Sequence, residues 1–377
     1  MKKIISVIIA LFLCNSVPVF AIESELDAES VILMEASTGE VLYEKNADAP
    51  LPPASVTKIM TVLLIMEAIH QGKFELGDKV SVSEHAANMG GSQVYLEPGE
   101  QMTVDELLKC VVVASANDAA AALAEFCCGS EEEFVDQMNR RAKELGMNNT
   151  HFENTNGLDD TTTKHLTSAR DIAIMSAELL KHEQIFAYTN IWMDTIRNGT
   201  FGLTNTNRLI RFYKGANGLK TGSTSKAGFC ISATALRDGL QLIAVVMASP
   251  TRDARNNIAV KLLDHGFANY GFYADEAADL ENVTIPVKGS VNTEITVRVP
   301  DSFRKLVEKN QKDKIERFVS IESELKAPIK QGTTVGNITY TMNGKEIGSM
   351  PIVANENADR IEFWDLLKIA LKKLAIF

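Results

Sequence analysis

The first zone of the chain, residues 24–278, mixes the two-residue period of strands with the 3.6-residue period of helices. Short apolar runs at residues 31–34 and 39–43 flank a turn and predict two paired strands. The nearly continuous apolar run at residues 57–69 predicts a buried helix. Further helices are predicted at residues 104–113, 118–126, 131–145 and 255–272, and adjacent strands at residues 228–235 and 240–249.

The second zone, residues 280–357, consists of short runs rich in β-branched residues. Turn signals such as Asn343-Gly344 separate these runs. The predicted strands lie at residues 283–287, 294–299, 318–322, 334–341 and 347–353. Evenly spaced short strands of this kind predict a small β-sandwich domain.

The N-terminal residues 1–21 carry the pattern of a secretory signal peptide. Lys2 and Lys3 precede an apolar run at residues 4–20, and a sharp change to acidic residues follows Ala21. This pattern predicts cleavage after Ala21 and export. An uncleaved membrane anchor is the less favoured alternative, because the run is short and interrupted by polar residues and a proline.

The third zone, residues 359–377, has the pattern of an amphipathic helix. Its apolar face is formed by Phe363, Trp364, Leu367, Leu371 and Leu374, extended by Ala370 and Ala375. Two interpretations remain: a helix docked on the β-domain, or a helix lying in a membrane interface. The second is favoured, because the chain is exported and apolar residues continue to Phe377. The segment is too short and too charged to span a bilayer comfortably.

Composition narrows the class of function. With 377 residues, 45% of them hydrophobic, the chain is long enough for two or three domains with their own cores. Its formal charge of −11 argues against a nucleic-acid binder. Four cysteines remain after cleavage, none with zinc-site spacing, and nothing indicates a metal or an organic cofactor. We expect Cys110 and Cys127, which lie in apolar helical patterns, to be small buried residues, although a disulfide among Cys110, Cys127, Cys128 and Cys230 stays open.

Candidate chemistry begins at Ser55 and Lys58, where the first buried helix begins. A spacing of three residues places both side chains on one face of a helical turn. A serine hydroxyl needs a neighbouring base, and a lysine can be that base only if burial or a nearby positive charge lowers its pKa. Alone, the pattern is a weak signal, because a helix-capping serine followed by a solvated lysine has the same spacing.

Two further polar elements interrupt apolar segments. Ser115 and Asn117 form a short break between two predicted helices, so they must be hydrogen-bonded inside the fold, cap a helix or face a cleft. Lys220, Thr221 and Gly222 lie just before the next predicted strand. The glycine would let a substrate approach the backbone closely, whereas a solvated turn is the alternative.

Together, the motifs around Ser55, Ser115 and Lys220 form the set found in penicillin-interacting serine enzymes. The sequence resembles the D-alanyl-D-alanine carboxypeptidases, the low-molecular-weight penicillin-binding proteins. The resemblance covers nearly the whole chain and includes residues 89–100 and 150–159. It implies an α+β fold, in which an antiparallel sheet flanked by helices precedes a small all-β sandwich and a C-terminal amphipathic helix.

The resemblance also implies catalytic roles. Ser55 would attack the carbonyl between the two terminal D-alanines of a peptidoglycan stem peptide, and Lys58 would take its proton. Backbone N–H groups of Ser55 and Ser223 would hold the oxyanion. Ser115 would relay a proton to the leaving D-alanine, with Lys220 tuning that transfer.

The remaining motif residues would bind the substrate. Asn117 would hold the substrate amide, and Thr221 and Arg255 would bind the terminal carboxylate, with Arg252 as the alternative cation. Water would then release the acyl-enzyme. The implied partners are the stem peptide, β-lactam antibiotics and, through residues 359–377, the outer face of the cytoplasmic membrane.

Two alternatives stay open. A class A β-lactamase would need a glutamate after Ser115 to activate the deacylating water; Glu153 lies in roughly the right stretch but lacks the expected asparagine spacing. A non-enzymatic wall-binding scaffold with a relic site is the second, and the intact motifs count against it. Rapid penicillin hydrolysis would favour the first. Absence of both D-alanine release and penicillin labelling would favour the second.

Overall fold

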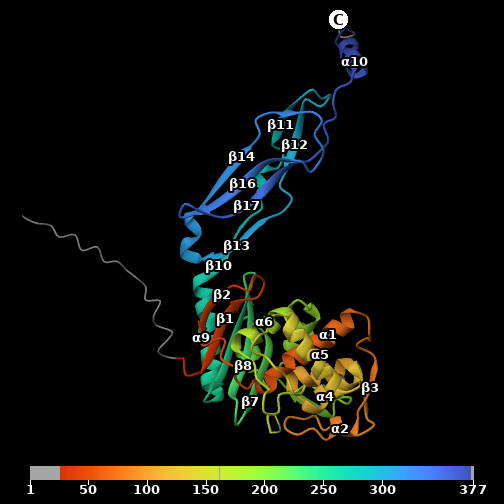
Figure 1. The fold of residues 1–377 in the computed structure, drawn as a ribbon, viewed down its shortest axis with the longest axis vertical. Helices are drawn as coiled ribbons and strands as arrows, with labels where there is room; N and C mark the ends of the chain where they lie inside the picture. Colours follow the sequence, from red (N-terminus) through yellow and green to blue (C-terminus); the bar gives the residue numbers. More distant parts are fainter. Residues whose placement is uncertain (1–25, 161, 375–377) are drawn as a thin grey trace, which may run out of the picture. The chain divides into compact units, whose positions relative to one another are not determined.

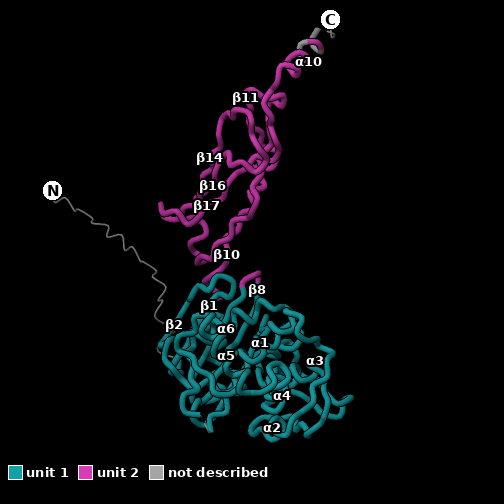
Figure 2. The backbone as a smooth tube through the Cα atoms, turned by 45° about the vertical axis from the view of Figure 1, so that its right-hand side comes forward, with its two compact units in different colours: residues 1–237, 241–264 teal, residues 238–240, 265–377 magenta. Residues whose placement is uncertain are grey.

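The structure is a computed structural model that describes residues 26–160 and 162–374 (Figure 1). The predicted signal segment 1–21 and, in the tail, Ala375 and Phe377 lie outside the described residues. Contacts divide the chain into two units, residues 1–237 with 241–264 and residues 238–240 with 265–377 (Figure 2). The first unit combines helices with strands, and the second consists mainly of strands.

A five-stranded sheet with the strand order β2-β1-β9-β8-β7 forms the centre of the first unit. Its strands are β1 (Ser30–Glu35), β2 (Val41–Lys45), β7 (Ala216–Thr224), β8 (Gly228–Arg237) and β9 (Leu240–Ser249). β1 pairs antiparallel with β2 and β9, and β7 pairs antiparallel with β8. Both predicted strand pairs are confirmed, and β7 is an edge strand that the sequence pattern did not indicate.

Helices lie on both faces of this sheet (Figure 1). Ile32 and Val245 belong to the hydrophobic core that the sheet shares with the helices of one face. The adjacent residue Val31 is equally buried, because successive strand residues point to opposite faces. On that second face lies α9 (Arg252–Asn269), whose Leu262 is fully buried. The sheet is therefore apolar on both sides.

The helices of the first face come from residues 58–180. They are α1 (Lys58–His70), α3 (Val104–Lys109), the π-helix η4 (Cys110–Ala114), α4 (Asn117–Cys128), α5 (Glu131–Glu144) and α6 (Ala169–Leu180). α1 is buried along almost its whole length, which explains its nearly continuous apolar sequence. The predicted helix at 255–272 is observed as α9, but residues from Tyr270 onward belong to strand β10.

Short elements complete the first unit. They are η3 (Ala54–Thr57), β3 (Lys79–Ser81), α2 (Glu84–Ala87), β4 (Gln101–Thr103), η5 (Glu183–Ile185), α7 (Phe186–Thr189), β5 (Met193–Ile196), β6 (Phe201–Thr204) and α8 (Leu209–Phe212). β3 pairs with β4, and β5 pairs with β6.

The second unit is an all-β domain followed by a helix. One sheet has the order β14-β16-β17-β12-β11-β15, and β10 pairs with β13 in another. Its elements are β10 (Tyr270–Asp275), η6 (Ala278–Leu280), β11 (Thr284–Lys288), β12 (Glu294–Arg298), β13 (Phe303–Glu308), η7 (Lys309–Lys314), β14 (Ile315–Ile321), β15 (Leu325–Lys326), β16 (Thr334–Met342) and β17 (Lys345–Ala354). Phe303 stacks on Tyr340 with ring centroids 3.8 Å apart, so the two sheets share a core. The predicted β-domain is confirmed.

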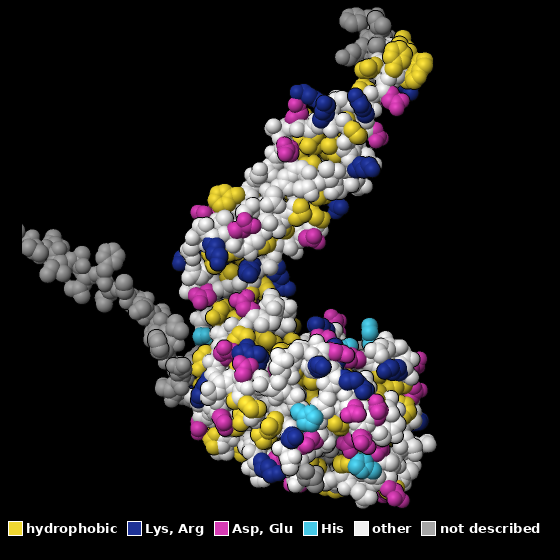
Figure 3. All heavy atoms as spheres, viewed as in Figure 1, with side chains coloured by type: hydrophobic (Ala, Val, Ile, Leu, Met, Phe, Trp, Pro, Cys, Tyr) yellow, Lys and Arg dark blue, Asp and Glu magenta, His cyan; other side chains and the backbone are white. Residues whose placement is uncertain are grey.

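The C-terminal helix α10 (Phe363–Leu374) exposes apolar side chains (Figure 3). Phe363 is 70% exposed, Trp364 66% and Leu371 57%. These described side chains are largely exposed, and the position of the helix in a membrane interface stays a prediction. Among the described helices, none is long and apolar enough to cross a bilayer.

Candidate active site

Ser55 lies in the 3₁₀ turn η3, immediately before α1. The preceding residue, Ala54, has a φ of +49°, so the chain enters the turn through the left-handed region. Side chains three residues apart eclipse one another in a 3₁₀ turn. As a result, Ser55 Oγ and Lys58 Nζ are 3.0 Å apart.

The Lys58 amine is completely buried and contacts three oxygen atoms. Besides the serine hydroxyl, Nζ donates to Asn117 Oδ1 at 2.6 Å and to the Asn156 carbonyl at 2.8 Å. Burial lowers the pKa of Lys58 well below its ordinary 10.5, and the positive charge of Lys220 lowers it further. Carbonyl oxygens can only accept hydrogen bonds. A neutral amine therefore gives its two N–H groups to them and turns its lone pair toward Ser55.

The second motif surrounds this amine. Ser115 ends η4 in the left-handed conformation, with a φ of +64°. Asn117 begins α4 but does not cap it, because the N-cap is Ala116 and no side chain caps the helix. Instead, Asn117 Nδ2 donates to the Gly90 carbonyl and its backbone N–H to the Ser92 carbonyl, both at 2.7 Å. Asn117 thus joins Lys58 to the loop between α2 and β4.

The third motif lies within strand β7, just before β8 begins at Gly228 as expected, and the alternative of a solvated turn is wrong. Lys220 is buried, and its Nζ donates to the Thr221 carbonyl at 2.8 Å. Burial and then the charge of Arg255 lower the pKa of Lys220 to about 7. Near neutral pH this amine is therefore partly uncharged.

Gly222 is the point where β7 meets the serine turn. A Cβ atom at this position would lie 2.8 Å from the Ser55 backbone nitrogen and 2.9 Å from the Pro53 carbonyl oxygen. Such contacts are too short for a real Cβ. Gly222 therefore lets the backbone of the serine turn approach strand β7 closely. The sequence had suggested a glycine here for the close approach of a substrate.

Two arginines lie at the start of α9. Arg255 is only 3% exposed; its Nη1 donates to the Cys230 carbonyl at 3.3 Å and its Nη2 to Asn256 Oδ1 at 2.9 Å. Burial and then the charge of Arg252 lower the pKa of Arg255 to about 10. Arg252 itself is exposed.

A cavity of about 180 Å³ joins these elements. It is lined by Ser55, Ser92, Ser115, Thr206, Thr221, Gly222, Ser223, Arg252 and Arg255. Lys58, Asn117 and Lys220 are not among the lining residues and are buried. The sequence did not single out Ser92, although it lies in the 89–100 stretch. Nor did it single out Thr206, which accepts a hydrogen bond from Thr221 Oγ1 at 2.8 Å.

Glu153 does not line this cavity. Its Oε2 accepts the backbone N–H groups of Thr163 and Lys164 at 2.9 and 3.0 Å. The side chain borders a separate hollow with His85 and Glu131. Glu153 is therefore not placed to activate a water beside Ser55, as the β-lactamase alternative requires.

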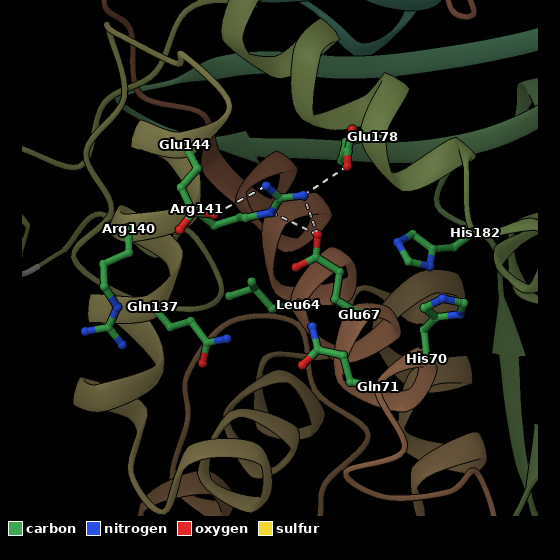
Figure 4. A pocket seen from close by; sticks show the side chains of 10 residues that line it. All are labelled: Leu64, Glu67, His70, Gln71, Gln137, Arg140, Arg141, Glu144, Glu178 and His182. Carbon is green, nitrogen blue, oxygen red and sulfur yellow. Dashed lines mark hydrogen bonds and ion pairs between the residues drawn. The ribbon is translucent and has the colours of Figure 1, made fainter.

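A larger hollow of about 560 Å³ lies among α1, α5 and α6 (Figure 4). At its centre, Arg141 contacts carboxylate oxygens of Glu67 at 2.7 Å, Glu178 at 2.9 Å and Glu144 at 3.4 Å. None of the lining residues belongs to the three motifs. These ion pairs connect three helices and have a structural role.

The cysteines do not form a reactive group in the described chain. Cys110, Cys127, Cys128 and Cys230 are all free thiols. Cys110 is buried as expected, but the expectation for Cys127 is wrong, since Cys127 near the end of α4 is only partly buried. Burial raises the pKa of Cys110 and Cys127 to about 12 and that of Cys230 to about 11. Within residues 26–160 and 162–374, no group of three His, Cys, Asp or Glu side chains could hold a metal ion.

A serine beside a buried lysine amine whose pKa is lowered, at the wall of a polar cavity in a helix-flanked sheet, is typical of a serine-type hydrolase. Residues 17–251 match the D-alanyl-D-alanine carboxypeptidase family, and residues 276–360 match the C-terminal domain of penicillin-binding protein 5. The D-alanyl-D-alanine carboxypeptidase DacF of Bacillus subtilis is 43% identical over 346 residues, which are 91% of this chain and 88% of that protein. DacC of Escherichia coli is 34% identical over 92% of this chain and 90% of its own length.

Solved structures agree with these matches. Penicillin-binding protein 5 of Haemophilus influenzae superimposes with a TM-score of 0.71 at 29% identity over 89% of this chain and 98% of that one. PBP3 of Streptococcus pneumoniae, a peptidoglycan synthesis regulatory factor, gives 0.72 at 29% identity over 89% and 100%. The chain belongs to the D-alanyl-D-alanine carboxypeptidase family, as the resemblance implied. The α+β fold with a C-terminal β-domain and the serine-type enzyme class are confirmed with it.

Proposed function

We propose that this chain removes the terminal D-alanine from peptidoglycan stem peptides through a Ser55 acyl-enzyme, with Lys58 as the base. The surroundings of the Lys58 amine carry the proposal. Two carbonyl oxygens occupy two sides of Nζ, and the third side faces the serine hydroxyl at 3.0 Å. The family's D-alanyl-D-alanine carboxypeptidase activity supports the choice of substrate.

In the first step, Ser55 Oγ attacks the carbonyl carbon between the two D-alanines while its proton passes to Lys58 Nζ. A positioned general base contributes typically about 10²–10⁴-fold to such a step. The carbonyl oxygen becomes negative and accepts hydrogen bonds from the backbone N–H groups of Ser55 and Ser223. The N-terminal end of α1 adds a favourable dipole beside Ser55.

In the second step, the bond between carbon and nitrogen breaks and the leaving D-alanine amine needs a proton. Ser115 lines the same cavity as Ser55 and passes that proton on, so that Lys58 returns to its neutral form. Lys220, whose pKa of about 7 keeps it partly neutral, tunes this transfer. Asn117 holds the substrate amide with the N–H that its bonds to Lys58 and Gly90 leave available.

The carboxylate of the terminal D-alanine binds at the arginine end of the cavity. Thr221 lines that end and would turn its hydroxyl proton from Thr206 to the carboxylate, and Arg255 supplies a fixed positive charge. Because the Arg255 guanidinium already donates to Cys230 and Asn256, the exposed Arg252 is the cation with more freedom to contact the carboxylate directly.

Water finally hydrolyses the Ser55 ester and releases the shortened peptide. A penicillin would acylate the same serine as its β-lactam ring opens. Glu153 lies elsewhere, so we expect this penicilloyl ester to persist. Penicillin-binding protein D2 of Listeria monocytogenes, solved in its ampicillin-bound form, supports this inhibition; it is 31% identical, with a TM-score of 0.59 over 64% of this chain and 98% of its own.

The enzyme would work outside the cytoplasmic membrane, where peptidoglycan lies. The segment 1–21 would direct export, and the exposed apolar residues of α10, Phe363 and Trp364 among them, would lie in the membrane interface. No part of this assignment requires a membrane-spanning helix.

The proposal is tested with the mature protein and two substrates. Wild-type protein should release D-alanine from a peptide ending in D-Ala-D-Ala and should form a covalent adduct with a fluorescent penicillin. Ser55→Ala should abolish both, and mass spectrometry of the wild-type adduct should locate the added mass on Ser55.

Two results would contradict this function. Labelling of the Ser55→Ala protein, or an adduct on another residue, would remove Ser55 as the nucleophile. Rapid turnover of penicillin without D-alanine release would instead favour a β-lactamase.

A further inference from the structure

The loop after α5 packs against the turn that carries Ser55. We call residues 153–160 with 162–165 the bracing segment. Two of its backbone carbonyls accept hydrogen bonds from α1: Asn156 from Lys58 Nζ at 2.8 Å and Thr155 from Thr61 Oγ1 at 2.6 Å. The segment therefore contacts α1 at Lys58 and again at Thr61, about one turn further along the helix.

The last residue of the segment, His165, is only 5% exposed and has a hydrogen-bond partner on each ring nitrogen. The backbone N–H of Glu153 donates to Nδ1 at 2.9 Å. A backbone N–H can only donate, so Nδ1 carries no proton and Nε2 must carry one. Nε2 therefore donates to Thr57 Oγ1, which lies 2.8 Å away.

From Thr57 the chain of hydrogen bonds continues to the nucleophile turn. The Thr57 hydroxyl has one proton and donates it to the Ala54 carbonyl at 2.8 Å. Ala54 is the residue with φ of +49° that directs the chain into Ser55. Gly157 of the bracing segment lies against the same carbonyl, since a Cβ there would be 1.8 Å from the Ala54 oxygen.

The direction of every bond in this chain requires an uncharged imidazole. A second ring proton on Nδ1 would face the Glu153 N–H, donor against donor. Burial lowers the pKa of His165 to about 4, although the nearby carboxylates of Glu153 and Asp159 oppose that effect. The ring is therefore neutral at the pH where the enzyme would work.

We propose that His165 is a positioning residue for the Ser55 nucleophile, acting through Thr57 and the carbonyl of Ala54. The inference rests on the proposed function, because it assigns a task in acylation by Ser55. His165 lines neither the cavity nor the proton path, and its effect is to hold the strained turn in the orientation that keeps Ser55 Oγ at Lys58 Nζ. A displacement of about 1 Å in such a geometry can cost about 10²-fold in rate.

Three variants separate this role from simple packing. His165→Gln keeps one acceptor and one donor on neighbouring atoms, whereas His165→Leu keeps only the bulk. Thr57→Val removes the hydroxyl with little change of shape. His151→Leu is the matched control, because His151 is an exposed histidine near the same segment.

The readout is kcat for D-alanine release, normalised to the fraction of protein that a fluorescent penicillin can label to completion. His165→Leu should lower kcat by about 10–100-fold with KM within about twofold, as expected for a misplaced nucleophile. His165→Gln should retain kcat within about fivefold, and His151→Leu should match the wild type. Adding Thr57→Val to His165→Leu should cost less than the product of the two single losses, because either variant alone already breaks the bond between His165 and Thr57.

Three results would overturn the inference: an unchanged normalised kcat in His165→Leu, equal losses in the Gln and Leu variants, or losses that multiply in the double variant. Each of these results would mean that His165 only supports the fold, while the proposed mechanism at Ser55 would be unaffected. Absence of D-alanine release by the wild-type protein would be distinct, since it would overturn the proposed function and this inference together.

Discussion

At the scale of single residues, the decisive feature is how the protein lowers the pKa of a lysine. Burying an ammonium group is costly, so Lys58 loses its proton more easily than a lysine in water. Asn117 Oδ1 and the Asn156 carbonyl then orient the neutral amine, because each can only accept. The hydroxyl of Ser55 is the remaining partner, and in the proposed mechanism it is the group that gives up a proton.

Replacement of Lys58 by methionine tests this arrangement while filling the same space. Lys58→Met should slow covalent labelling by fluorescent penicillin by at least about 10²–10⁴-fold, because no base remains for Ser55. Lys73→Met removes an exposed lysine and is the control that should label at the wild-type rate. An equally fast Lys58→Met protein would show that another group takes the proton.

The pH dependence of the wild-type enzyme follows from the direction of the Lys58 shift. The amine is an active base only when neutral, and its pKa is lowered well below 10.5. Labelling should therefore be fast at pH values far below 10.5 and should fall as pH decreases through the lowered pKa. The rate constant for labelling, measured across pH on intact protein, checks this; a rate that reached its plateau only near 10.5 would contradict it.

The sequence was most informative about the site where chemistry needs a particular side chain. Ser55, Ser115 and Lys220 were identifiable because a nucleophile, a hydroxyl and a second amine recur in short motifs. It could not predict contributions from the backbone, such as the Asn156 carbonyl on Lys58, because every residue has a carbonyl. Thr206 was missed for a related reason: only the pairing of distant segments brings it to Thr221.

At the scale of elements, β7 and η3 must touch backbone to backbone. Gly222→Ala would place a methyl group 2.8 Å from the Ser55 nitrogen and should push the strand from the serine turn. We expect a loss of about 1–3 kcal/mol in the free energy of unfolding and labelling slower by at least about 10-fold. Gly202→Ala, in strand β6 with nothing within 4 Å of the new atom, is the matched control. Equal behaviour of the two variants in denaturant titrations and labelling would refute the close contact.

A second contact between elements is made by Arg141 of α5, which pairs with Glu67 of α1 and Glu178 of α6 (Figure 4). Arg141→Leu would leave the carboxylates of Glu67 and Glu178 without their shared partner. Because these side chains are about one-fifth exposed, we expect a loss of about 1–2 kcal/mol rather than the larger cost of a fully buried pair. Arg140→Leu is the control, since its pair with Glu133 is exposed and should contribute little.

The Arg141 contribution should also depend on pH. Burial raises the pKa of Glu178, but Lys181 and Arg141 outweigh burial and leave it below the ordinary 4.5. A carboxyl group with a lowered folded-state pKa stabilises the fold fully above its unfolded-state value and loses that effect as pH falls through the folded-state value. The difference in melting temperature between wild type and Arg141→Leu should thus shrink below pH 4.5. A difference that grew on acidification would contradict the ion-pair explanation.

Elements were predictable from sequence where periodicity and burial agree. The apolar run of α1 and the alternating strands of the β-domain gave strong patterns. β7 did not, because Gly218 and Gly222 interrupt it and glycine is disfavoured in strands. α6 was missed although its N-cap Ser168 accepts the Asp171 N–H, a start signal that precedes a regular apolar spacing.

At the scale of the whole molecule, the question is where the enzyme works. Residues Phe363, Trp364, Leu366, Leu367 and Leu371 of α10 are 40–70% exposed, and nothing among the described residues covers them. An aromatic and leucine face opposite charged residues is typical of helices that lie in a bilayer interface. The segment before α10 is tied to the β-domain, because Ile361 donates to the Gly289 carbonyl and Arg360 pairs with Ser290.

Deletion of residues 363–377 is therefore a cleaner test than removal of the whole tail from Asp359, since it spares these two contacts. The shortened protein should move from the membrane fraction to the soluble fraction. Its kcat on a small D-Ala-D-Ala peptide should stay within about twofold, because the candidate site lies in the first unit.

A double variant, Trp364→Glu with Leu367→Glu, keeps the length of the helix but makes its apolar face polar, and it should release the protein equally. Binding of purified protein to phosphatidylglycerol vesicles provides the direct measurement. If the shortened protein still sedimented with vesicles, the attachment would have to come from another part of the molecule.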